Sequence, residues 1–360
     1  MWRINRLGRI AFGDIERVKG GKIIMATYKR QRYLFMVTDP VHIGTGGYRL
    51  GRVDNSIVRE PGTRVPKIPG TSLHGAARAY ASQLYENPEA AGQNHKDVKD
   101  PDQNPICYTF GYIKSDDEGN QTKAYSGVVN IFDAHILAFP VCSMAGPVWV
   151  SSYKRLSKAG FTVKNSSFSN GKEEDRAFLD NWELDEIFVS WQRSEPLNLG
   201  WLMLNVSGRV TVIPPKNWNK AAWNEAGNHL VLVEETLFSQ IVNSNLEVRT
   251  SVAIDPWRGA AEEKALFTYE AIPRATFLTA DVVLDDYREA WPLTKQDCTK
   301  TLKGNVLPGK PWLGPLSVVE AGLHMIEWLG VGGMGTRGFG RMAMIGDPIE
   351  ERYGKGYSGE

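Results

Sequence analysis

Cysteine is scarce in this sequence of 360 residues. Its three cysteines, Cys107, Cys142 and Cys298, have no CxxC spacing, which argues against a disulfide framework and against a thiolate zinc site. We expect them to be structural, with a metal site at His95 and Cys107 as the alternative. Long apolar runs are also lacking, and the first residues contain no apolar segment like that of a secretory signal. We therefore expect a cytoplasmic protein that does not contact a membrane.

The sequence also lacks the common nucleotide-binding motifs and a strong excess of charge. No GK[ST] follows a Walker-type loop, and the GxGxxG at 333–338 follows an expected helix rather than a strand. The net charge is +1, whereas domains that bind nucleic acid are usually basic. Basic side chains nevertheless cluster at 29–32, 49–64 and 337–341, while acidic side chains gather elsewhere. This segregation is compatible with a basic track for RNA.

A proline-glycine turn at 66–70 precedes the first clear helix. Proline fixes its own φ and pushes the preceding residue toward extended geometry, so the turn cannot be helical. Apolar residues follow at helical spacing over 72–84, with Thr71 or Ser72 as N-cap. The free amides at the helix start could hold a phosphate, although capped helices are common in proteins that bind nothing. The candidate RNA contacts here are Lys67, Gly70, Ser72, His74 and Arg78.

A second glycine-rich segment lies near the C-terminus, in LGVGGMGTRGFGR at 329–341. Glycine lets backbone amides approach a ligand, while the arginines and Phe339 offer charge and a stacking face, a combination that suits single-stranded nucleic acid. The alternative is a flexible turn before a strand. The candidate RNA contacts are Gly332, Gly333, Gly335, Arg337 and Gly338.

The rest of the pattern predicts an α+β protein. Strands are expected at 33–37, 128–132, 146–150, 201–206, 231–234, 277–284 and 341–345, and further helices at 182–189 and 316–329. Residues 86–124 and 151–182 are expected to be insertions, because the first is polar and rich in turn formers. A Pro-Trp-Arg-Gly tip between two short arms favours an exposed β-hairpin at 249–266.

The chain resembles the RAMP superfamily of CRISPR RNA-binding proteins in five segments. They are GRVDNSIVRE, VPKIPGTSLHGAAR, the FDA…FPV block, ALFTYE and the glycine loop, in the family's order. The resemblance covers most of 33–345 and is closest to the repeated backbone subunit of the Cmr (type III-B) effector complex, ahead of its Csm sister. It implies a ferredoxin-like, RRM-related core with large insertions and a thumb-like hairpin, in one domain over 25–345. Residues 1–24 would be an extension, or Met25 the true start, and 346–360 a flexible tail.

The resemblance also implies a function. Such a subunit binds crRNA, stacks head to tail with further copies of itself beside other subunits of a type III complex, and cleaves the paired, complementary target RNA in antiviral defence. The two glycine-rich segments would then converge on one RNA track, with Asp54 over the opposite strand. The resemblance makes Asp54 the cutting residue and a ligand of Mg²⁺ or another divalent cation, with no organic cofactor. It adds His42 and Glu270 as catalytic candidates, and Arg52 and Arg59 as RNA contacts.

The sequence departs from the family pattern in places. Tyr269 and Ala271 flank Glu270 where an acid and a tyrosine are expected, and His74 replaces a lysine. From the residues alone, an aspartate beside an asparagine is more often a turn former, and an isolated loop histidine is more often structural. Two functions therefore remain as alternatives: a catalytically inert backbone subunit, or a single-copy RAMP-type endoribonuclease that processes precursor crRNA.

The hairpin tip carries a further hypothesis. In the family, a thumb hairpin pushes between guide and target strands, so an apolar or aromatic group must compensate for unstacking of bases. Ile254, Pro256 and Trp257 are the candidates for this wedge. Alternatively, Trp257 caps the core of its own hairpin.

Overall fold

The structure is a computed structural model that describes residues 16–19, 22–25, 28–46, 53–92, 94–116, 118, 120–165, 185–292 and 312–353. Two of the residues discussed above, Arg52 and Cys298, lie outside these ranges. No helix within the described ranges has the length and apolar character needed to cross a membrane.

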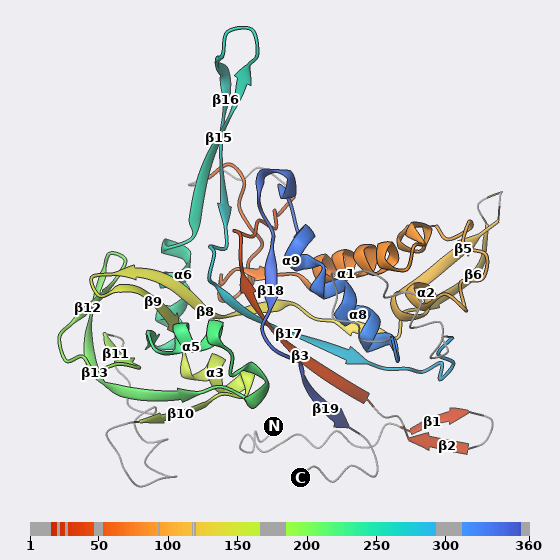
Figure 1. The fold of residues 1–360 in the computed structure, drawn as a ribbon, viewed down its shortest axis with the longest axis horizontal. Coiled ribbons are helices and arrows are strands. Elements are labelled where there is room, and N and C mark those ends of the chain that lie inside the picture. Colours follow the sequence, from red (N-terminus) through yellow and green to blue (C-terminus); the bar gives the residue numbers. More distant parts are fainter. Residues whose placement is uncertain are drawn as a thin grey trace, which may run out of the picture.

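A mixed sheet of 13 strands forms the centre of the molecule (Figure 1). Its strands are β3 (Tyr28–Val37), β4 (Lys67–Ile68), β7 (Val129–Ile131), β8 (Ala134–Ser143), β9 (Gly146–Ser151), β10 (Thr162–Asn165), β11 (Glu186–Val189), β12 (Leu197–Leu199), β13 (Leu202–Ile213), β14 (Leu230–Leu232), β17 (Phe277–Leu284), β18 (Met342–Met344) and β19 (Ile349–Tyr353). The main path runs β10–β13–β11–β14–β9–β8–β17–β3–β18. Most neighbours are antiparallel, but β11 with β13 and β14 with β9 are parallel.

Helices pack on both faces of this sheet. They are α1 (Gly70–Leu84), α2 (Pro105–Phe110), α3 (Tyr153–Ala159), α5 (Ala221–Gly227), α6 (Glu235–Ser244), α8 (Pro315–His324) and α9 (Ile326–Leu329), with short 3-10 turns at η1 (Pro88–Ala91), η2 (Lys216–Trp218) and η3 (Gly335–Arg337). Successive side chains of a strand point to opposite faces, so Tyr33 and Phe35 of β3 join the core under α1 and α8, while Leu34 joins the core under α3 and α5. The α+β class is therefore confirmed.

Most of the predicted strands are found. The clearest is β17, which has the predicted bounds and pairs with β3 from Phe277 opposite Met36 to Leu284 opposite Lys29. The predicted helix over 182–189 is wrong: 186–189 form β11, while 182–184 lie outside the described residues. The predicted cap of α1 is also wrong, because the helix begins at Gly70 and its N-cap, Pro69, has no side-chain hydrogen bond.

The predicted insertion at 86–124 is folded. It contains η1, α2 and the strands β5 (Gly111–Ser115) and β6 (Gln121–Ser126), which pair with each other. Asn104 caps α2 by accepting from the Ile106 and Cys107 amides. Tyr108 is buried in the main core, so this polar segment is anchored by apolar residues. Within the described ranges, no group of three His, Cys, Asp or Glu side chains is arranged to hold a metal ion. Burial raises the pKa of the Cys107 thiol to about 11.

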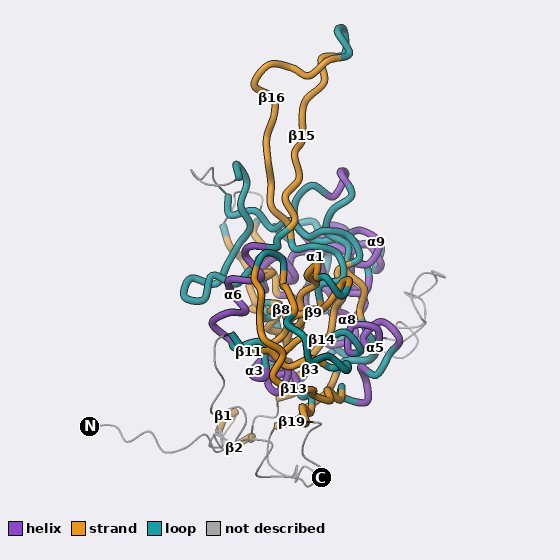
Figure 2. The backbone as a smooth tube through the Cα atoms, turned by 90° about the vertical axis from the view of Figure 1, so that its left-hand side faces the viewer, coloured by secondary structure: helices purple, strands orange, loops and turns teal. Residues whose placement is uncertain are grey.

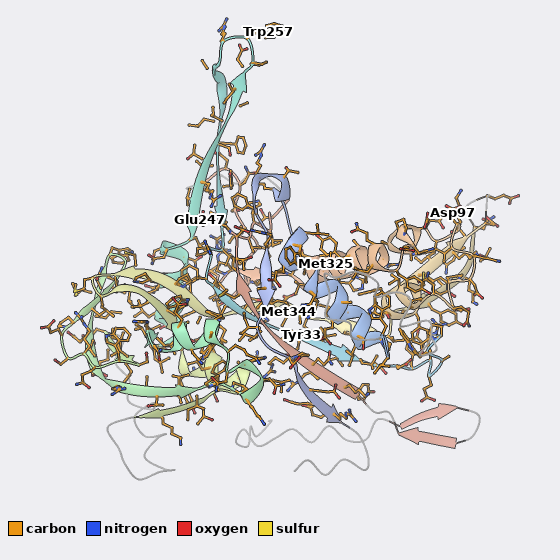
Figure 3. All side chains as sticks on the ribbon, in the orientation of Figure 1. Tyr33, Asp97, Glu247, Trp257, Met325 and Met344 are labelled. Carbon is orange, nitrogen blue, oxygen red and sulfur yellow. The ribbon has the colours of Figure 1, made fainter. Side chains whose placement is uncertain are left out.

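A long β-hairpin projects from the molecule (Figures 1 and 2). It consists of β15 (Glu247–Asp255) and β16 (Ala260–Ala271), and so extends beyond the predicted 249–266 at both ends. Trp257 at the tip is 95% exposed (Figure 3). The alternative in which Trp257 caps the core of the hairpin is therefore wrong.

Parts of the predicted N-terminal extension and of the predicted C-terminal tail form strands. Within 1–25, β1 (Glu16–Lys19) pairs with β2 (Lys22–Met25). Within the predicted tail, β19 pairs with the N-terminal half of β3, from Ile349 opposite Arg32 to Tyr353 opposite Tyr28. Residues 349–353 are thus part of the sheet, because β18 covers only the C-terminal half of β3 and leaves that edge open.

Candidate functional site

Three loops meet at the base of the hairpin. They are residues 40–46, 53–57 and 330–341. The Gly333 amide donates to the His42 carbonyl (2.9 Å), and the Asn55 amide donates to the Thr268 carbonyl of β16 (3.0 Å). The glycine loop at 330–341 therefore contacts the loop at 40–46, and the loop at 53–57 contacts the hairpin, whereas convergence of the two glycine-rich segments on one RNA track stays a prediction.

Asp54 is exposed on the second of these loops. Its Oδ2 accepts from the Thr268 amide (2.7 Å) and from the Thr268 hydroxyl (2.9 Å). These two hydrogen bonds, the amide first, lower the pKa of Asp54 below its ordinary value. The side chain is thus an ionised carboxylate at the surface, held at one oxygen.

His42 is buried between the first loop and the hairpin. Its Nδ1 lies 2.6 Å from the Glu270 carbonyl oxygen, which can only accept, so Nδ1 carries the proton. Its ring contacts Tyr269 edge-on at 6.1 Å, and a Cβ on Gly44 would lie 3.2 Å from Nε2. His42 therefore joins the loop at 40–46 to the hairpin, as expected of a structural histidine. Its Nε2 is the ring nitrogen that remains for a catalytic role.

Glu270 and Arg59 form an ion pair at the same place. Arg59 Nη2 lies 2.8 Å from the Glu270 carboxylate, and its other nitrogens donate to Asn243 (2.9 Å) and to the Ile57 carbonyl (3.0 Å). Each guanidinium nitrogen thus has an acceptor inside the protein, which argues against the RNA contact predicted for Arg59. Burial and pairing of the carboxylate argue against the catalytic role predicted for Glu270.

The start of α1 is occupied by a carboxylate of the chain itself. Asp133 accepts from the Gly70 amide (2.7 Å) and contacts Lys67 Nζ (2.5 Å), and Lys67 also reaches Glu60 (3.0 Å). A Cβ on Gly70 would lie 2.3 Å from the Ile131 carbonyl, so this glycine permits close packing. Asp133 thus takes the place of the predicted phosphate, which argues against the RNA contacts predicted for Lys67 and Gly70.

Two further predicted contacts on α1 face the 86–124 segment. Arg78 is largely buried and donates to the Ala90 (2.8 Å) and Gly111 (2.9 Å) carbonyls. His74 packs edge-on against Phe110 at 5.1 Å, and burial lowers its pKa. Both side chains tie this segment to α1, which argues against their predicted role in RNA binding.

The glycine loop and α1 enclose a cleft of about 320 Å³. It is lined by Ser72, Ala76, Tyr80, Leu329, Gly330, Val331, Gly332, Gly335 and Phe339. The Tyr80 hydroxyl donates to the Gly330 carbonyl (2.6 Å) and so fixes the loop to the helix. Ser72 is thus the predicted α1 residue that does lie beside the glycine loop.

The glycine loop itself has packed and open parts. A Cβ on Gly332 would lie 2.5 Å from the His42 carbonyl, whereas one on Gly335 would meet nothing within 4 Å. Arg337 is exposed over the Phe267 ring at 5.3 Å, and Gly338 follows it in the left-handed region (φ 78°). Phe339 is only 2% exposed, so it is not the stacking face that the sequence predicts.

Comparisons with known proteins identify the family of this chain. The RAMP superfamily model matches residues 35–343. The chain belongs to the RAMP superfamily. It is similar to the CRISPR system Cmr endoribonuclease Cmr4 of Pyrococcus furiosus, with 27% identity over 251 residues that cover 66% of this chain and 75% of the relative.

Solved structures share the RAMP fold of this chain. One chain of the type III-B Cmr-beta complex bound to cognate target RNA matches with a TM-score of 0.55 and 16% identity, over 88% of this chain and 96% of that chain. A chain of the same complex in the apo state matches with a TM-score of 0.54 and 14% identity, with the same coverage.

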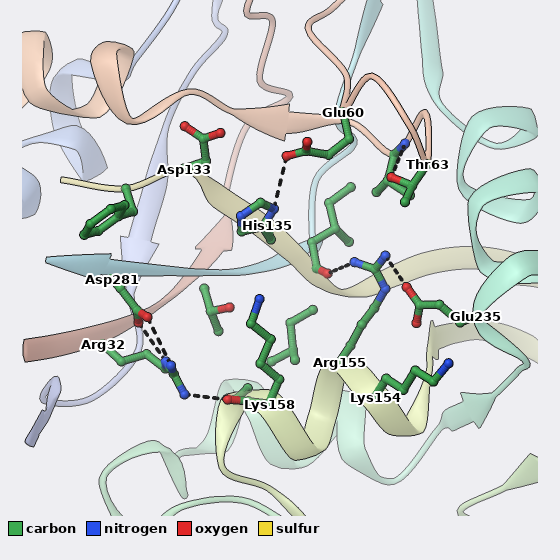
Figure 4. A pocket seen from close by; sticks show the side chains of 16 residues that line it. Arg32, Glu60, Thr63, Asp133, His135, Lys154, Arg155, Lys158, Glu235 and Asp281 are labelled. Carbon is green, nitrogen blue, oxygen red and sulfur yellow. Dashed lines mark hydrogen bonds and ion pairs between the residues drawn. The ribbon is translucent and has the colours of Figure 1, made fainter. Parts of the chain in front are cut away.

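A larger cavity of this RAMP chain contains none of the predicted site residues (Figure 4). It measures about 480 Å³, and α3 forms one of its walls. Its lining includes two ion pairs, Arg32 with Asp281 (2.7 Å) and Arg155 with Glu235 (2.6 Å). These four charges are thus neutralised in pairs, while Lys154 and Lys158 of α3 also line the cavity.

Thr268 is the site residue that sequence reasoning missed. In the ALFTYE segment the predicted catalytic candidate is Glu270, yet Thr268, two positions earlier, forms the hydrogen bond to Asp54. The period-2 pattern of a strand could have indicated it, because Thr268 and Glu270 must face the same side of β16.

Proposed function

We propose that this chain is a crRNA-binding backbone subunit of a type III CRISPR effector complex of the Cmr kind, and that it cleaves guide-paired target RNA at Asp54. The observation that carries this proposal is the exposed, ionised Asp54 at the base of a projecting hairpin, beside a glycine loop that contacts the first loop. In this account the sheet and its helices are a ferredoxin-like, RRM-related core, and the hairpin is a thumb.

The guide would lie along the glycine loop. Gly335 and the exposed Arg337 offer a backbone without side-chain obstruction and a positive charge, and Ser72 lines the adjoining cleft. Such contacts read backbone and shape, so base pairing would supply sequence specificity. Copies would stack head to tail along the crRNA, because a heterologous contact grows an open filament, and other subunits of the complex would end it.

Cleavage would use a 2′-hydroxyl of the target as nucleophile. Distortion of the strand by the hairpin would align that oxygen with the scissile phosphate. As the 2′-oxygen bonds to phosphorus and gives its proton to water, the bond from phosphorus to the 5′-oxygen would break, and that oxygen would take up a proton from water. The products would be a 2′,3′-cyclic phosphate and a 5′-hydroxyl. A carboxylate with a lowered pKa is a weak proton acceptor at neutral pH, so Asp54 would act mainly through its negative charge.

The surroundings of Asp54 supply only part of a binding site for a divalent cation. Among the described residues, no group of three or more His, Cys, Asp or Glu side chains that could hold a metal ion includes Asp54. Mg²⁺ is often held by one or two carboxylates together with phosphate oxygens and water, so Asp54 and the RNA could share the ion. When bound, the ion would stabilise negative charge on the phosphate.

The hairpin tip would be the wedge. Ile254 and Trp257 are 64% and 95% exposed, which leaves apolar surface free to replace stacking between bases. Pro256 stiffens the turn between them. Because Ile254 and Trp257 are so exposed, their apolar surface is available for contact with a partner and is not covered by the hairpin itself.

The test is target cleavage by the assembled complex with crRNA, labelled complementary RNA and Mg²⁺. We expect cuts at regular intervals, lost in Asp54→Ala while target affinity is retained. Asp97→Ala removes an exposed aspartate from the far end of the 86–124 segment (Figure 3) and should cut normally. Intact RNA with the natural protein would favour the inert backbone subunit. Cleavage of repeat RNA by the isolated chain would favour the processing enzyme.

A further inference from the structure

The contact between Asp54 and Thr268 is reciprocal. Thr268 gives two hydrogen bonds to Asp54 Oδ2, and the Asp54 amide returns one to the Thr268 hydroxyl oxygen (3.1 Å). The hydroxyl is therefore donor and acceptor at once. Both the backbone and the carboxylate of Asp54 are fixed by one side chain of the hairpin.

The position of Thr268 on β16 explains this contact. Thr268 lies opposite Thr250 of β15, and its own amide and carbonyl point away from β15, toward Asp54 and Asn55. The Glu270 amide, two residues on, donates to the Asn55 carbonyl (3.0 Å). The Asp54 loop therefore lies along the outer edge of β16 like a short additional strand, and Oδ2 takes the place of a strand carbonyl.

The same contacts leave one oxygen of Asp54 for chemistry. Within the described ranges, the hydrogen bonds of the carboxylate all use Oδ2. Oδ1 is held at a fixed angle because Oδ2 and the Asp54 amide are both restrained. An aspartate on an unrestrained loop would instead lose side-chain freedom each time it engaged a substrate.

We propose that Thr268 is a positioning residue that aims Asp54 Oδ1 at the RNA and couples its orientation to the hairpin strand. This inference rests on the proposed function, because it assumes that Asp54 acts on target RNA. The strand that holds Asp54 is also the strand that leads to the Trp257 tip. Insertion of the hairpin into the duplex would then also place the Asp54 carboxylate.

Three substitutions test this in the assembled complex. Thr268→Val keeps shape and β-branching but removes the hydroxyl, and should slow single-turnover cleavage about tenfold at unchanged target affinity, as expected for loss of a hydrogen bond to a charged group. Thr268→Ser keeps the hydroxyl and should restore the natural rate. Thr250→Val removes a hydroxyl from the directly opposite, exposed position and should leave rate and affinity unchanged.

The outcomes separate this inference from the proposed function. A natural cleavage rate in Thr268→Val, or equal slowing in Thr268→Ser and Thr268→Val, would overturn the positioning role. Asp54→Ala is assayed in the same series: if it cuts at the natural rate, the proposed function fails whatever Thr268 does. If Asp54→Ala is inactive and Thr268→Val is fully active, only the inference fails.

Discussion

At the residue scale, the basic side chains divide into those bound within the chain and those free for RNA. Arg59, Lys67 and Arg78 each have acceptors inside the protein, whereas Arg337 is exposed over an aromatic ring. Partners such as Glu270 lie far away in the sequence, so local clusters of charge cannot separate the two groups. RNA affinity should therefore depend on few cations.

Substitution of Arg337 tests this division. Arg337→Gln should weaken crRNA binding about equally for all sequences and reduce the slope of log affinity against log salt by about one, because one phosphate contact is lost. Arg352→Gln removes an exposed arginine of β19 that is paired with Glu350 (2.8 Å) and should leave the slope unchanged. Filter-binding titrations between low and physiological salt measure both slopes. Equal slopes for Arg337→Gln and the natural protein would contradict the assignment.

His95 predicts a pH dependence of stability. Its pKa is lowered, first by burial and further by the positive charge of Arg78, 2.5 Å from its Nε2. Since the unfolded chain takes up a proton near pH 6.5 and the folded chain only at lower pH, stability should be full above about pH 6.5 and fall as pH decreases below it. Urea midpoints between pH 7.5 and 5 should show this fall, reduced in His95→Gln but not in the exposed His229→Gln. An unchanged profile for His95→Gln would exclude this origin.

At the element scale, one glycine sets the packing of α8 on α1. A Cβ on Gly322 would lie 2.2 Å from the Ala77 carbonyl, whereas one on Gly75 of α1 would meet nothing within 4 Å. Gly322→Ala should therefore destabilise the fold by about 1–3 kcal/mol or more through overpacking. Gly75→Ala, at an exposed helical position, should instead stabilise it by about 0.5–1 kcal/mol. Opposite shifts of the urea midpoint are expected, and shifts of the same sign would contradict this packing.

The hairpin should be dispensable for folding and needed for target cleavage. Trp257→Ala removes a side chain without buried contacts, so the free energy of unfolding should change by less than about 0.5 kcal/mol. Target cleavage should become slower, because the wedge no longer distorts the strand. Trp201→Ala, at a site 76% exposed on another hairpin, should affect neither. Normal cleavage by Trp257→Ala would exclude the wedge.

Long, strongly patterned elements were predictable from the sequence, and short ones were not. The apolar alternation of Phe277–Leu284 has a single interpretation, so β17 was found with its bounds. Glu186–Val189 contains only three consecutive apolar residues, which fit a helix or a strand equally well, and pairing in the sheet decides between the two. The segment at 86–124 has no apolar periodicity from which its helix and strands could be predicted, because its core contacts are made with α1 and α8.

At the scale of the whole molecule, the sheet brings the site together. Its residues come from 40–46, 53–57, 247–272 and 330–341, and the central sheet places all four segments at the base of one hairpin. The family resemblance predicted that the two glycine-rich segments converge on one RNA track, and the structure brings Ser72 of α1 and the glycine loop to one cleft. The period-2 pattern of β16 could place Thr268 on the same face as Glu270, but it could not indicate that Asp54 is the partner of Thr268, because the two residues are 214 positions apart.

The most direct test is to map RNA on this surface by photo-crosslinking. Thiouridines are placed singly along the guide, and separately along the target, in the assembled complex, and adducts are located by mass spectrometry. The account predicts guide adducts within 330–341 and target adducts within 53–57 and at the hairpin tip, 254–258. Adducts of both strands confined to the face of α3, with none on the glycine loop or the tip, would contradict it.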